Sequence, residues 1–277
     1  MVIGLALVLA VVGYLVTRGP GSTPAEGCSV TGAHGMSVTL DLDQASHAAT
    51  IAAVAHAHGL PQRAVTIALA TAIQESKLRN IDYGDRDSLG LFQQRPSQGW
   101  GSPAQIRDPV YASGKFFTAL IRVPDYLSLP VTVAAQKVQR SGYPEAYAQH
   151  EDTGALLATA LTGHEGAALS CTVNGVGAVN PGRPSDTAVT DAVRREFGPG
   201  LVPAHSAAGV TYRTTDRATG WMLALWMVCH ATELHITSVT FDNHQWSSTA
   251  SSHGWIHHDS PHGQTSEVDI TLARPEK

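Results

Sequence analysis

The stretch IALATAIQESKLRNIDYGDRDSLGLFQQ, residues 67–94, decides how the first half of the chain folds. Apolar and small residues recur through its first part at helical spacing, which predicts an amphipathic helix that opens after Leu60-Pro61 and ends near Ser76. Glu75 stands beside the apolar stripe at the end of this helix. Partial burial there would raise the pKa of its carboxyl group, so Glu75 is a candidate general acid. The alternative is an ordinary solvated glutamate at a helix end.

A polar loop follows the helix and leads into a second motif. Residues 80–88 are rich in Asp, Asn and Gly, which favour turns. The segment Gly90-Leu91-Phe92-Gln93-Gln94 comes next. Its glycine permits a tight turn toward a ligand, and its glutamine amides can donate to and accept from sugar hydroxyls. The rings of Tyr83, Phe92 and Trp100 add flat apolar surfaces on which sugars stack.

With these motifs the chain resembles the lysozyme-like superfamily, in particular the soluble lytic transglycosylase-like domains of actinobacterial cell-envelope proteins. The catalytic Glu-Ser pair of that family is matched by Glu75-Ser76, and its Gly-Leu-(Met/Phe)-Gln motif by Gly90 to Gln93. Residues 138–143 are similar, less specifically, to a later motif that completes the family's groove. The resemblance covers residues 41–165 and implies a mainly α lysozyme-like domain. It implies catalysis by Glu75 and substrate binding by Ser76, Tyr83, Gly90, Phe92, Gln93, Gln94, Gln139 and Tyr143.

The reaction depends on whether a second carboxyl group stands near Glu75. Retaining and inverting glycosidases use two carboxyl groups, whereas a lytic transglycosylase lets the sugar's own 6-hydroxyl attack and needs only the acid. Asp82, Asp85 and Asp87 could supply a second carboxylate, but turn and capping roles suit them better. We therefore favour a peptidoglycan lytic transglycosylase over a lysozyme-like muramidase. The alternative from another class is a non-catalytic peptidoglycan-binding or scaffold protein of the cell envelope.

Composition limits the remaining function classes. A chain of 277 residues with 43% hydrophobic residues can fill two modest cores. The net charge of −5 leaves no excess of basic residues, so we do not expect nucleic acid as a partner. The expected partner, the peptidoglycan glycan strands, carries carboxylates, so binding has to come from specific groups and not from overall attraction. We expect no cofactor.

The N-terminal segment is apolar. Residues 1–19 are almost uninterrupted by charge, which predicts a transmembrane or signal segment. Residues 20–40 then have the composition of a linker. We therefore expect a single-pass protein of the cell membrane, anchored through this N-terminal helix with its domains outside the cytoplasm, or a protein secreted to the cell wall.

The three cysteines agree with export. Cys28 precedes the predicted helical domain and Cys171 follows it, so a disulfide between them would close that domain. Such a loop restricts the unfolded chain by about 4 to 5 kcal/mol in the chain-entropy model. Cys229 remains, inside an apolar helix, and we predict a buried free thiol.

Cap and turn residues set further boundaries around the first domain. Asp43 is a candidate cap for a helix that ends at Gly59, and Pro130 is the predicted start of a helix that ends at Gly142. Residues 166–185 include Cys171 and become rich in Gly, Asn, Pro and Ser beyond it, which predicts a second linker.

Residues 186–277 predict a smaller α+β accessory domain. A short helix over residues 186–197 and an apolar helix over residues 220–235 precede two alternating segments, 236–241 and 267–272, which are typical of strands. This part resembles an uncharacterised C-terminal domain of other actinobacterial envelope proteins, at Gly220-Trp221, Val239-Thr240-Phe241 and Gln245-Trp246.

A histidine-rich segment near the C-terminus raises a metal-binding alternative. Imidazole and carboxylate groups form zinc or nickel sites, but the spacing here fits no familiar ligand pattern and the segment is rich in Ser and Gly. We therefore predict a loop without a specific metal site, and a metal-handling protein stays as a third hypothesis. The residues concerned are His244, His253, His257, His258, Asp259 and His262.

Overall fold

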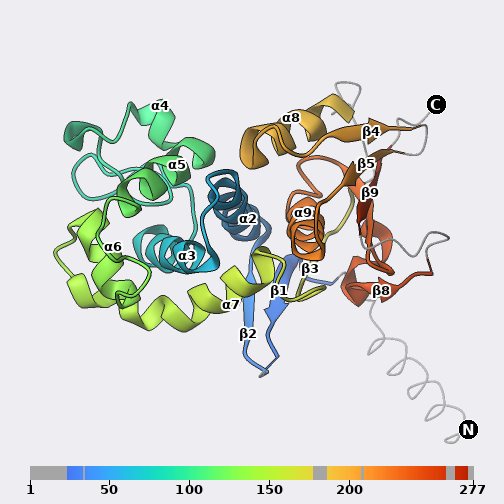
Figure 1. Cartoon of the computed structure of the whole chain (residues 1–277), viewed down its shortest axis with the longest axis horizontal. Helices are drawn as coiled ribbons and strands as arrows, with labels where there is room; N and C mark the ends of the chain where they lie inside the picture. The colour runs from blue at the N-terminus through green and yellow to red at the C-terminus, as the bar shows by residue number, and fades with distance from the viewer. Residues whose placement is uncertain (1–23, 34, 177–185, 207–208, 260–265, 274–277) are drawn as a thin grey trace, which may run out of the picture.

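The computed structural model describes residues 24–33, 35–176, 186–206, 209–259 and 266–273. The protein is a mixed α+β fold in which all paired strands are antiparallel. Figure 1 shows a helical body on one side, a sheet-bearing part on the other, and a small sheet below and between them. The expected N-terminal apolar helix lies outside the described residues. Within those residues, no helix has the length and apolar character needed to cross a membrane.

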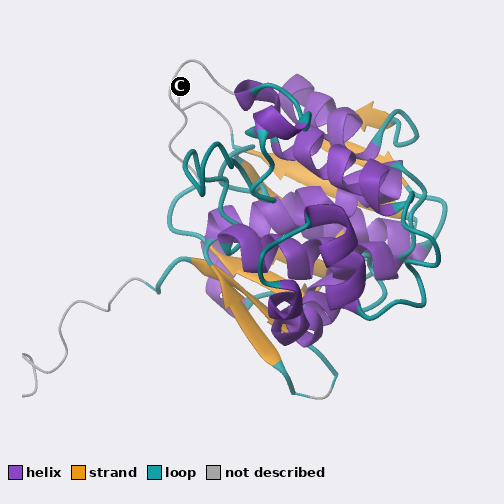
Figure 2. Cartoon of the chain, turned by 90° about the vertical axis from the view of Figure 1, so that its left-hand side faces the viewer, coloured by secondary structure: helices purple, strands orange, loops and turns teal. Residues whose placement is uncertain are grey.

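The helical body is built around α3, which is buried at every position from Ala64 to Ala72. Helices α2, α6 and α7 pack against it, and Figure 2 shows this group from the helical side of the molecule. Gly154 lets α7 come close, because a side chain there would meet the Thr66 carbonyl oxygen at 2.9 Å. The elements of the body are α2 (Leu42–Ala57), α3 (Gln62–Ser76), η1 (Pro96–Gln98), α4 (Pro103–Ile106), α5 (Pro109–Leu120), α6 (Val131–Gln139), η2 (Pro144–His150) and α7 (Glu151–Leu161).

Two of the three helix starts that we predicted in this body are confirmed, and the third is shifted. Pro61 and Pro130 immediately precede α3 and α6, as predicted. Helix α2 is capped by Asp41 and not by Asp43, which lies in its first turn. Asp41 is favoured because Gln44, three residues on, completes a capping box in which each side chain bonds the other's backbone N–H.

Both segments that we expected to be linkers contain strands. β1 (Gly27–Thr31) and β2 (Ser37–Leu40) lie within residues 20–40, and β3 (Leu169–Thr172) lies within residues 166–185. They form one antiparallel sheet in the order β2-β1-β3. The strands are four or five residues long and alternate between buried and exposed positions over only that length. Their periodicity is too brief to stand out from the polar residues around them.

The predicted disulfide joins this small sheet across its middle. Cys28 on β1 stands directly opposite Cys171 on β3, and the two form a disulfide over a sequence separation of 143 residues. The third cysteine, Cys229, is a buried free thiol, as predicted. The chain therefore enters and leaves the helical body at neighbouring, covalently joined strands.

The C-terminal part is a six-stranded sheet with two helices. The sheet runs in the order β4-β5-β9-β6-β7-β8. The segments predicted as a short helix and as two strands have the predicted bounds. The apolar helix differs: it spans 217–229 and not 220–235, because Asp216 caps it and His235 is left-handed with φ 51°. The elements are α8 (Asp186–Phe197), β4 (Pro203–His205), β5 (Val210–Arg213), α9 (Arg217–Cys229), β6 (Ile236–Phe241), β7 (His244–Ser247), η3 (Ser248–His253), β8 (Ile256–His257) and β9 (Glu267–Leu272).

The helical body and the C-terminal part share one core. Helix α9 is buried from Thr219 to Cys229 and packs against α2, β3 and β6. Two tryptophans of the C-terminal part also hold β3: Trp246 Nε1 donates to the carbonyl oxygen of Cys171 at 2.9 Å, and Trp255 Nε1 to that of Leu169 at 2.8 Å. The small sheet is thus packed from both sides.

Candidate active site at the end of helix α3

Glu75 lies in the last turn of α3 and is held by two other elements. Tyr147 of η2 donates a hydrogen bond from its hydroxyl group to Glu75 Oε1 at 2.6 Å. The side chain of Gln139, the last residue of α6, donates to the same carboxylate. Its amide also donates to the Phe92 carbonyl oxygen at 2.6 Å. Helices distant in sequence therefore meet at this one carboxyl group.

The surroundings of Glu75 favour its protonated form. Burial raises the pKa of the Glu75 carboxyl group above its ordinary value, and the hydrogen bonds from Tyr147 and Gln139 oppose that rise. The net direction is upward, as predicted from the sequence, and it is the direction that a general acid working near neutral pH needs. The residue is only partly buried, so its proton can still reach a bound molecule.

Tyr147 is a site residue that our sequence analysis did not predict. Its ring is fully buried, while its hydroxyl group reaches Glu75. Burial, followed by the bond to Glu75, raises the pKa of Tyr147 well above its usual range, so the hydroxyl group stays protonated and keeps donating. The two residues are 72 positions apart. The sequence shows only an aromatic residue shortly after the segment that carries Gln139.

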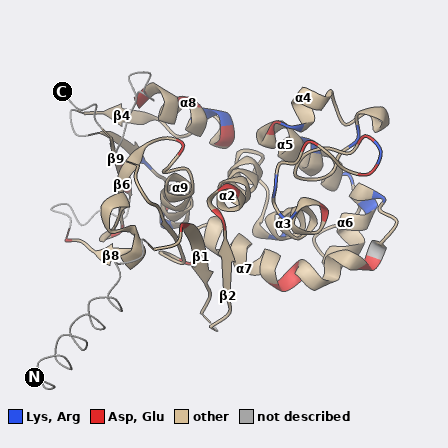
Figure 3. Cartoon of the chain, turned by 180° about the vertical axis from the view of Figure 1, so that it is seen from behind, with Lys and Arg blue, Asp and Glu red and all other residues tan. Residues whose placement is uncertain are grey.

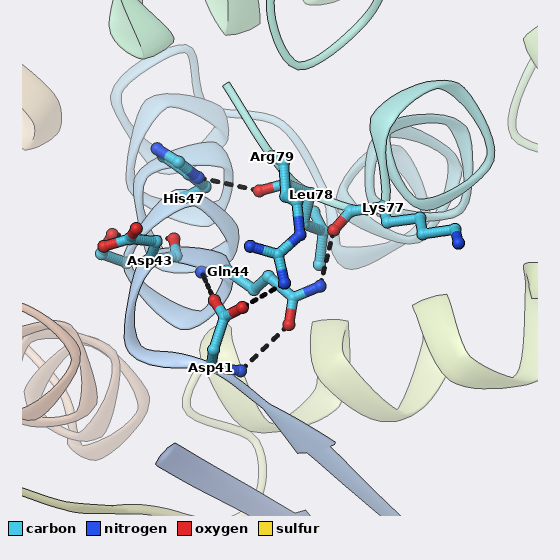
Figure 4. A network of polar contacts seen from close by, with 8 residues as sticks. Asp41, Asp43, Gln44, His47, Lys77, Leu78 and Arg79 are labelled. Carbon is cyan, nitrogen blue, oxygen red and sulfur yellow. Dashed lines mark hydrogen bonds and ion pairs between the residues drawn. The ribbon is translucent and has the colours of Figure 1, made fainter. Parts of the chain in front are cut away.

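The turn after Glu75 is fixed by side chains from α2 (Figure 4). The chain leaves α3 through two left-handed residues, Lys77 with φ 55° and Leu78 with φ 60°. Gln44 Nε2 donates to the Lys77 carbonyl oxygen at 2.8 Å, and His47 Nδ1 lies 2.8 Å from the Leu78 carbonyl oxygen. These contacts hold the backbone in a conformation that residues other than glycine rarely adopt.

An ion pair closes the same network. Arg79, one residue beyond the left-handed pair, contacts the carboxylate of Asp41, the cap of α2. Because Gln44 belongs both to the capping box and to the bond with Lys77, the start of α2 and the end of α3 are tied together. Sequence analysis missed this network, since each bond that joins α2 to the turn after α3 crosses more than thirty residues.

Ser76 and Gly90, which we expected to contact substrate, have structural roles within the protein. The Ser76 side chain is buried and donates to the Leu91 carbonyl oxygen at 2.8 Å, which joins the end of α3 to the Gly-Leu-Phe-Gln-Gln segment. Gly90 has φ 72°, and a side chain there would meet the Ile106 carbonyl oxygen at 2.6 Å. Gly90 therefore allows the chain to pass close to the protein's own backbone at Ile106, where we had expected a ligand.

Phe92 and Gln94, which we also expected to bind substrate, are internal, and neither side chain offers surface to a ligand. Phe92 has no exposed surface and stacks on Phe116 with ring centroids 4.6 Å apart. Gln94 is 2% exposed, and its amide donates to the Ala112 carbonyl oxygen at 3.1 Å. The motif thus builds the floor beneath the site, and it places the Phe92 carbonyl oxygen where Gln139 bonds it.

The other predicted binding residues remain accessible. Tyr83 is 69% exposed and Tyr143 is 78% exposed, so both rings can stack on a ligand. Gln93 and Gln139 are half-buried. Gln93 donates weakly to the carbonyl oxygens of Tyr83 and Gly90, at 3.3 and 3.2 Å. Of the expected set, these four have surface to offer to a sugar.

The acidic loop contains a turn-stabilising carboxylate, as the capping interpretation required. Asp87 accepts from Arg95 Nε at 2.7 Å and from the backbone N–H of Ser97 at 2.8 Å. These bonds hold the pKa of Asp87 far below its usual range, so it is ionised and already engaged. Asp82 and Asp85 are exposed. Every hydrogen bond that the structure gives to Asp87 lies within its own loop or with residues 95–97.

The histidine-rich segment brings a few side chains together. The rings of His244 and His257 lie 6.3 Å apart, and His257 Nε2 is 3.0 Å from Asp259 Oδ1. His262 lies outside the described residues. Among the described residues, no group of three or more His, Cys, Asp or Glu side chains is arranged to hold a metal ion.

No protein-family model matches the chain, and no curated protein matches its sequence.

Proposed function

We propose that the protein cleaves the glycan strands of peptidoglycan as a lytic transglycosylase, with Glu75 as its acid and base. The observation that carries the proposal is the Glu75 carboxyl group itself: it is partly buried, has a raised pKa, and is held by Tyr147 and Gln139. It also follows directly on the motif resemblance at Glu75-Ser76 and Gly90 to Gln93. On this proposal residues 41–165 form a lysozyme-like domain and residues 186–277 an accessory α+β domain.

The proposed reaction needs one carboxyl group in two roles. Glu75 gives its proton to the glycosidic oxygen as the bond from that oxygen to C1 breaks. The 6-hydroxyl of the same sugar then attacks C1, and its proton passes to the Glu75 carboxylate. The products are a new chain end and a 1,6-anhydro sugar, and Glu75 is restored to its starting form. Tyr147 and Gln139 orient the carboxylate and stabilise it while it is ionised.

One observation supports the single-carboxylate route, and a second supports export. Asp87 is occupied by Arg95 and Ser97, which leaves it poorly suited to activate a water molecule as a base. The predicted disulfide has formed between Cys28 and Cys171, and structural disulfides are typical of exported proteins. The latter supports a place outside the cytoplasm, either anchored to the membrane or secreted to the cell wall.

The test is digestion of purified peptidoglycan by the full chain and by a Glu75→Gln variant, with mass spectrometry of the released muropeptides. We expect 1,6-anhydro products from the parent chain and a loss of rate of at least about a hundredfold in the variant. A Glu196→Gln variant is the matched control, since it makes the same change at a buried carboxyl group elsewhere. If the products have only reducing ends, the enzyme is a hydrolase and the transglycosylase proposal is wrong.

A binding protein without turnover is the second candidate. Exposed Tyr83 and Tyr143 favour it, because stacking rings serve binding as well as catalysis. It replaces the first proposal if neither the parent nor the Glu75→Gln chain releases products while both sediment with the sacculi.

A further inference from the structure

A hollow of about 560 Å³ lies beside the candidate active site. It is formed where three segments meet: the end of α5, the end of α6 and the loop after η1. Its floor is apolar, with Val123 and Val138 both largely buried, and Trp100 stands half-buried at its wall. The polar groups around it come from Gln98, Arg122, Lys137, Gln139 and Arg140.

The charge at this hollow is unusual for the molecule. Arg122, Lys137 and Arg140 are all exposed, and none of the three side chains forms an ion pair with any residue that the structure describes. Most other arginines of the described chain, such as Arg63 and Arg95, contact a carboxylate. The protein as a whole has a net charge of −5. Figure 3 shows basic residues in blue on α6, at the edge of the helical body.

The hollow and the candidate catalytic group share a residue. Gln139 lines the hollow, bonds the Phe92 carbonyl oxygen and donates to the Glu75 carboxylate. Gln139 therefore connects the Glu75 carboxylate to a pocket with three positive charges that form no ion pair among the described residues. Such charges attract anions from solution and favour a ligand that brings its own carboxylates.

We propose that this hollow binds the carboxylate-bearing peptide stem next to the glycosidic bond that is cleaved at Glu75. The proposal rests on the proposed function and names the part of the substrate that this site selects. Peptide stems carry both carboxylates and methyl side chains. The carboxylates can pair with the three cations, and the methyl groups can pack against the apolar surface of Trp100, Val123 and Val138. The site thus distinguishes peptide-bearing glycan from bare glycan.

The test compares binding to two kinds of soluble glycan strand, one with its peptide stems and one from which an amidase has removed them. Binding is measured with the full chain in a Glu75→Gln background, so that it does not depend on turnover. We expect Arg122→Gln with Lys137→Gln to lower the preference for stem-bearing strands, expressed as the ratio of the two Kd values, by about fivefold. Arg140 is left unchanged because it caps α6 in a left-handed conformation with φ 52°.

The matched control removes two exposed arginines from the C-terminal part, by Arg194→Gln with Arg213→Gln. It has the same effect on net charge, and we expect it to leave the Kd ratio as it is in the parent. An equal fall of the ratio in both double variants would mean that net charge alone is responsible, and this would overturn the proposal. So would an unchanged ratio in the hollow variant.

A phosphate group of a wall polymer is also an anion, so a further experiment has to distinguish phosphate binding from carboxylate binding. Sacculi are treated with hydrofluoric acid to remove phosphate-linked polymers before strands are made. Charge-dependent binding that persists after this treatment supports the stem carboxylates, and binding that disappears assigns the hollow to phosphate and overturns the proposal. Failure of the proposed function has a different signature, namely no released products from the parent chain whatever the Kd ratio.

Discussion

Two glutamates of this protein occupy similar positions and differ in one decisive respect. Glu75 is the penultimate residue of α3, and Glu196 is the penultimate residue of α8. Burial raises the pKa of both carboxyl groups. Glu75 is partly exposed beside Tyr147, whereas Glu196 is only 8% exposed and accepts a hydrogen bond from Trp226 Nε1 at 2.6 Å.

The comparison shows that a raised pKa alone does not identify a catalytic acid. Glu196 lies where α8 and α9 meet α2, with His230, the residue directly after α9, at 4.0 Å from its carboxylate and Thr50 of α2 bonded to it. No substrate reaches a group enclosed in this way. Perturbed carboxyl groups are candidates for function only when a ligand has access to them, and access separates Glu75 from Glu196.

The largest expected effect is on stability, at Glu196. Glu196→Ala leaves the buried Trp226 N–H without its acceptor and opens a cavity between α8 and α9, so we expect a loss of about 3 kcal/mol in the free energy of unfolding. Urea titration measures it. Glu196→Gln keeps an acceptor and should cost less than about 1 kcal/mol. Glu75→Gln should likewise change stability little. Equal losses at both positions would remove the contrast between them.

The second prediction concerns pH. Burial raises the pKa of folded Glu196 to about 7 from an ordinary 4.5, so between these values the folded chain holds a proton that the unfolded chain has lost. The contribution of this group to stability is therefore present at low pH and is lost as the pH rises toward 7, by on the order of 2 kcal/mol.

Other groups near Glu196 titrate as well, and a subtraction isolates its contribution. Burial lowers the pKa of His230, which makes its own contribution fall as the pH decreases, and Arg195 and Asp108 also act on Glu196. We expect the unfolding free energy of the parent minus that of Glu196→Gln to fall by on the order of 2 kcal/mol from pH 5 to pH 8 and to become negative, so that the variant is the more stable chain at pH 8. A difference that is constant with pH would contradict the raised pKa.

The third prediction concerns the partner of Glu75. Tyr147→Phe removes a hydrogen bond that stabilises the carboxylate, so the pKa of Glu75 rises further. On the proposed function, the alkaline limb of the pH–rate profile moves to higher pH, and the rate below that limb falls by about tenfold because the acid is less well oriented. Anhydro-muropeptide release across a pH series measures both. A profile that keeps its position would mean that another group titrates.

The smallest expected effect is at the turn behind Glu75. Gln44→Ala removes the capping-box acceptor and the bond to the Lys77 carbonyl oxygen, for a loss of about 1 kcal/mol in unfolding free energy. Gln44→Glu keeps the acceptor for Asp41 and loses only the amide donor to Lys77. If the turn matters to the site, the Glu variant should retain stability and still show a reduced rate of glycan cleavage.

Local sequence patterns predicted many of the helices and strands of this fold. The elements that we missed depend on contacts between residues far apart in the sequence. The helix that ends at Ser76, the strand over residues 236–241 and the disulfide of Cys28 with Cys171 follow from periodicity and position along the chain, and all three are confirmed. The strands β1 and β3 were missed because their stability comes from pairing with each other across the whole helical body.

The candidate site shows the same division. Glu75 was predicted from its place on a helix, and the rise of its pKa from the burial expected there. Its partner Tyr147 and the inward direction of Phe92 depend on packing between α3, α5, α6 and η2, which no local signal reports. We predicted that motif residues such as Gln94 bind substrate because the sequence does not show which side of a turn faces the core.

The disulfide has a mechanical consequence. Cys28 and Cys171 link β1 directly to β3, and β3 in turn is held by Trp246 and Trp255 of the C-terminal part. The covalent path from the chain ahead of β1 to the C-terminal part therefore runs through this bridge and leaves out residues 29–170. The helical body with Glu75 lies outside this covalent path, so the segment that carries the carboxyl group is not itself extended when the two ends are pulled apart through the bridge.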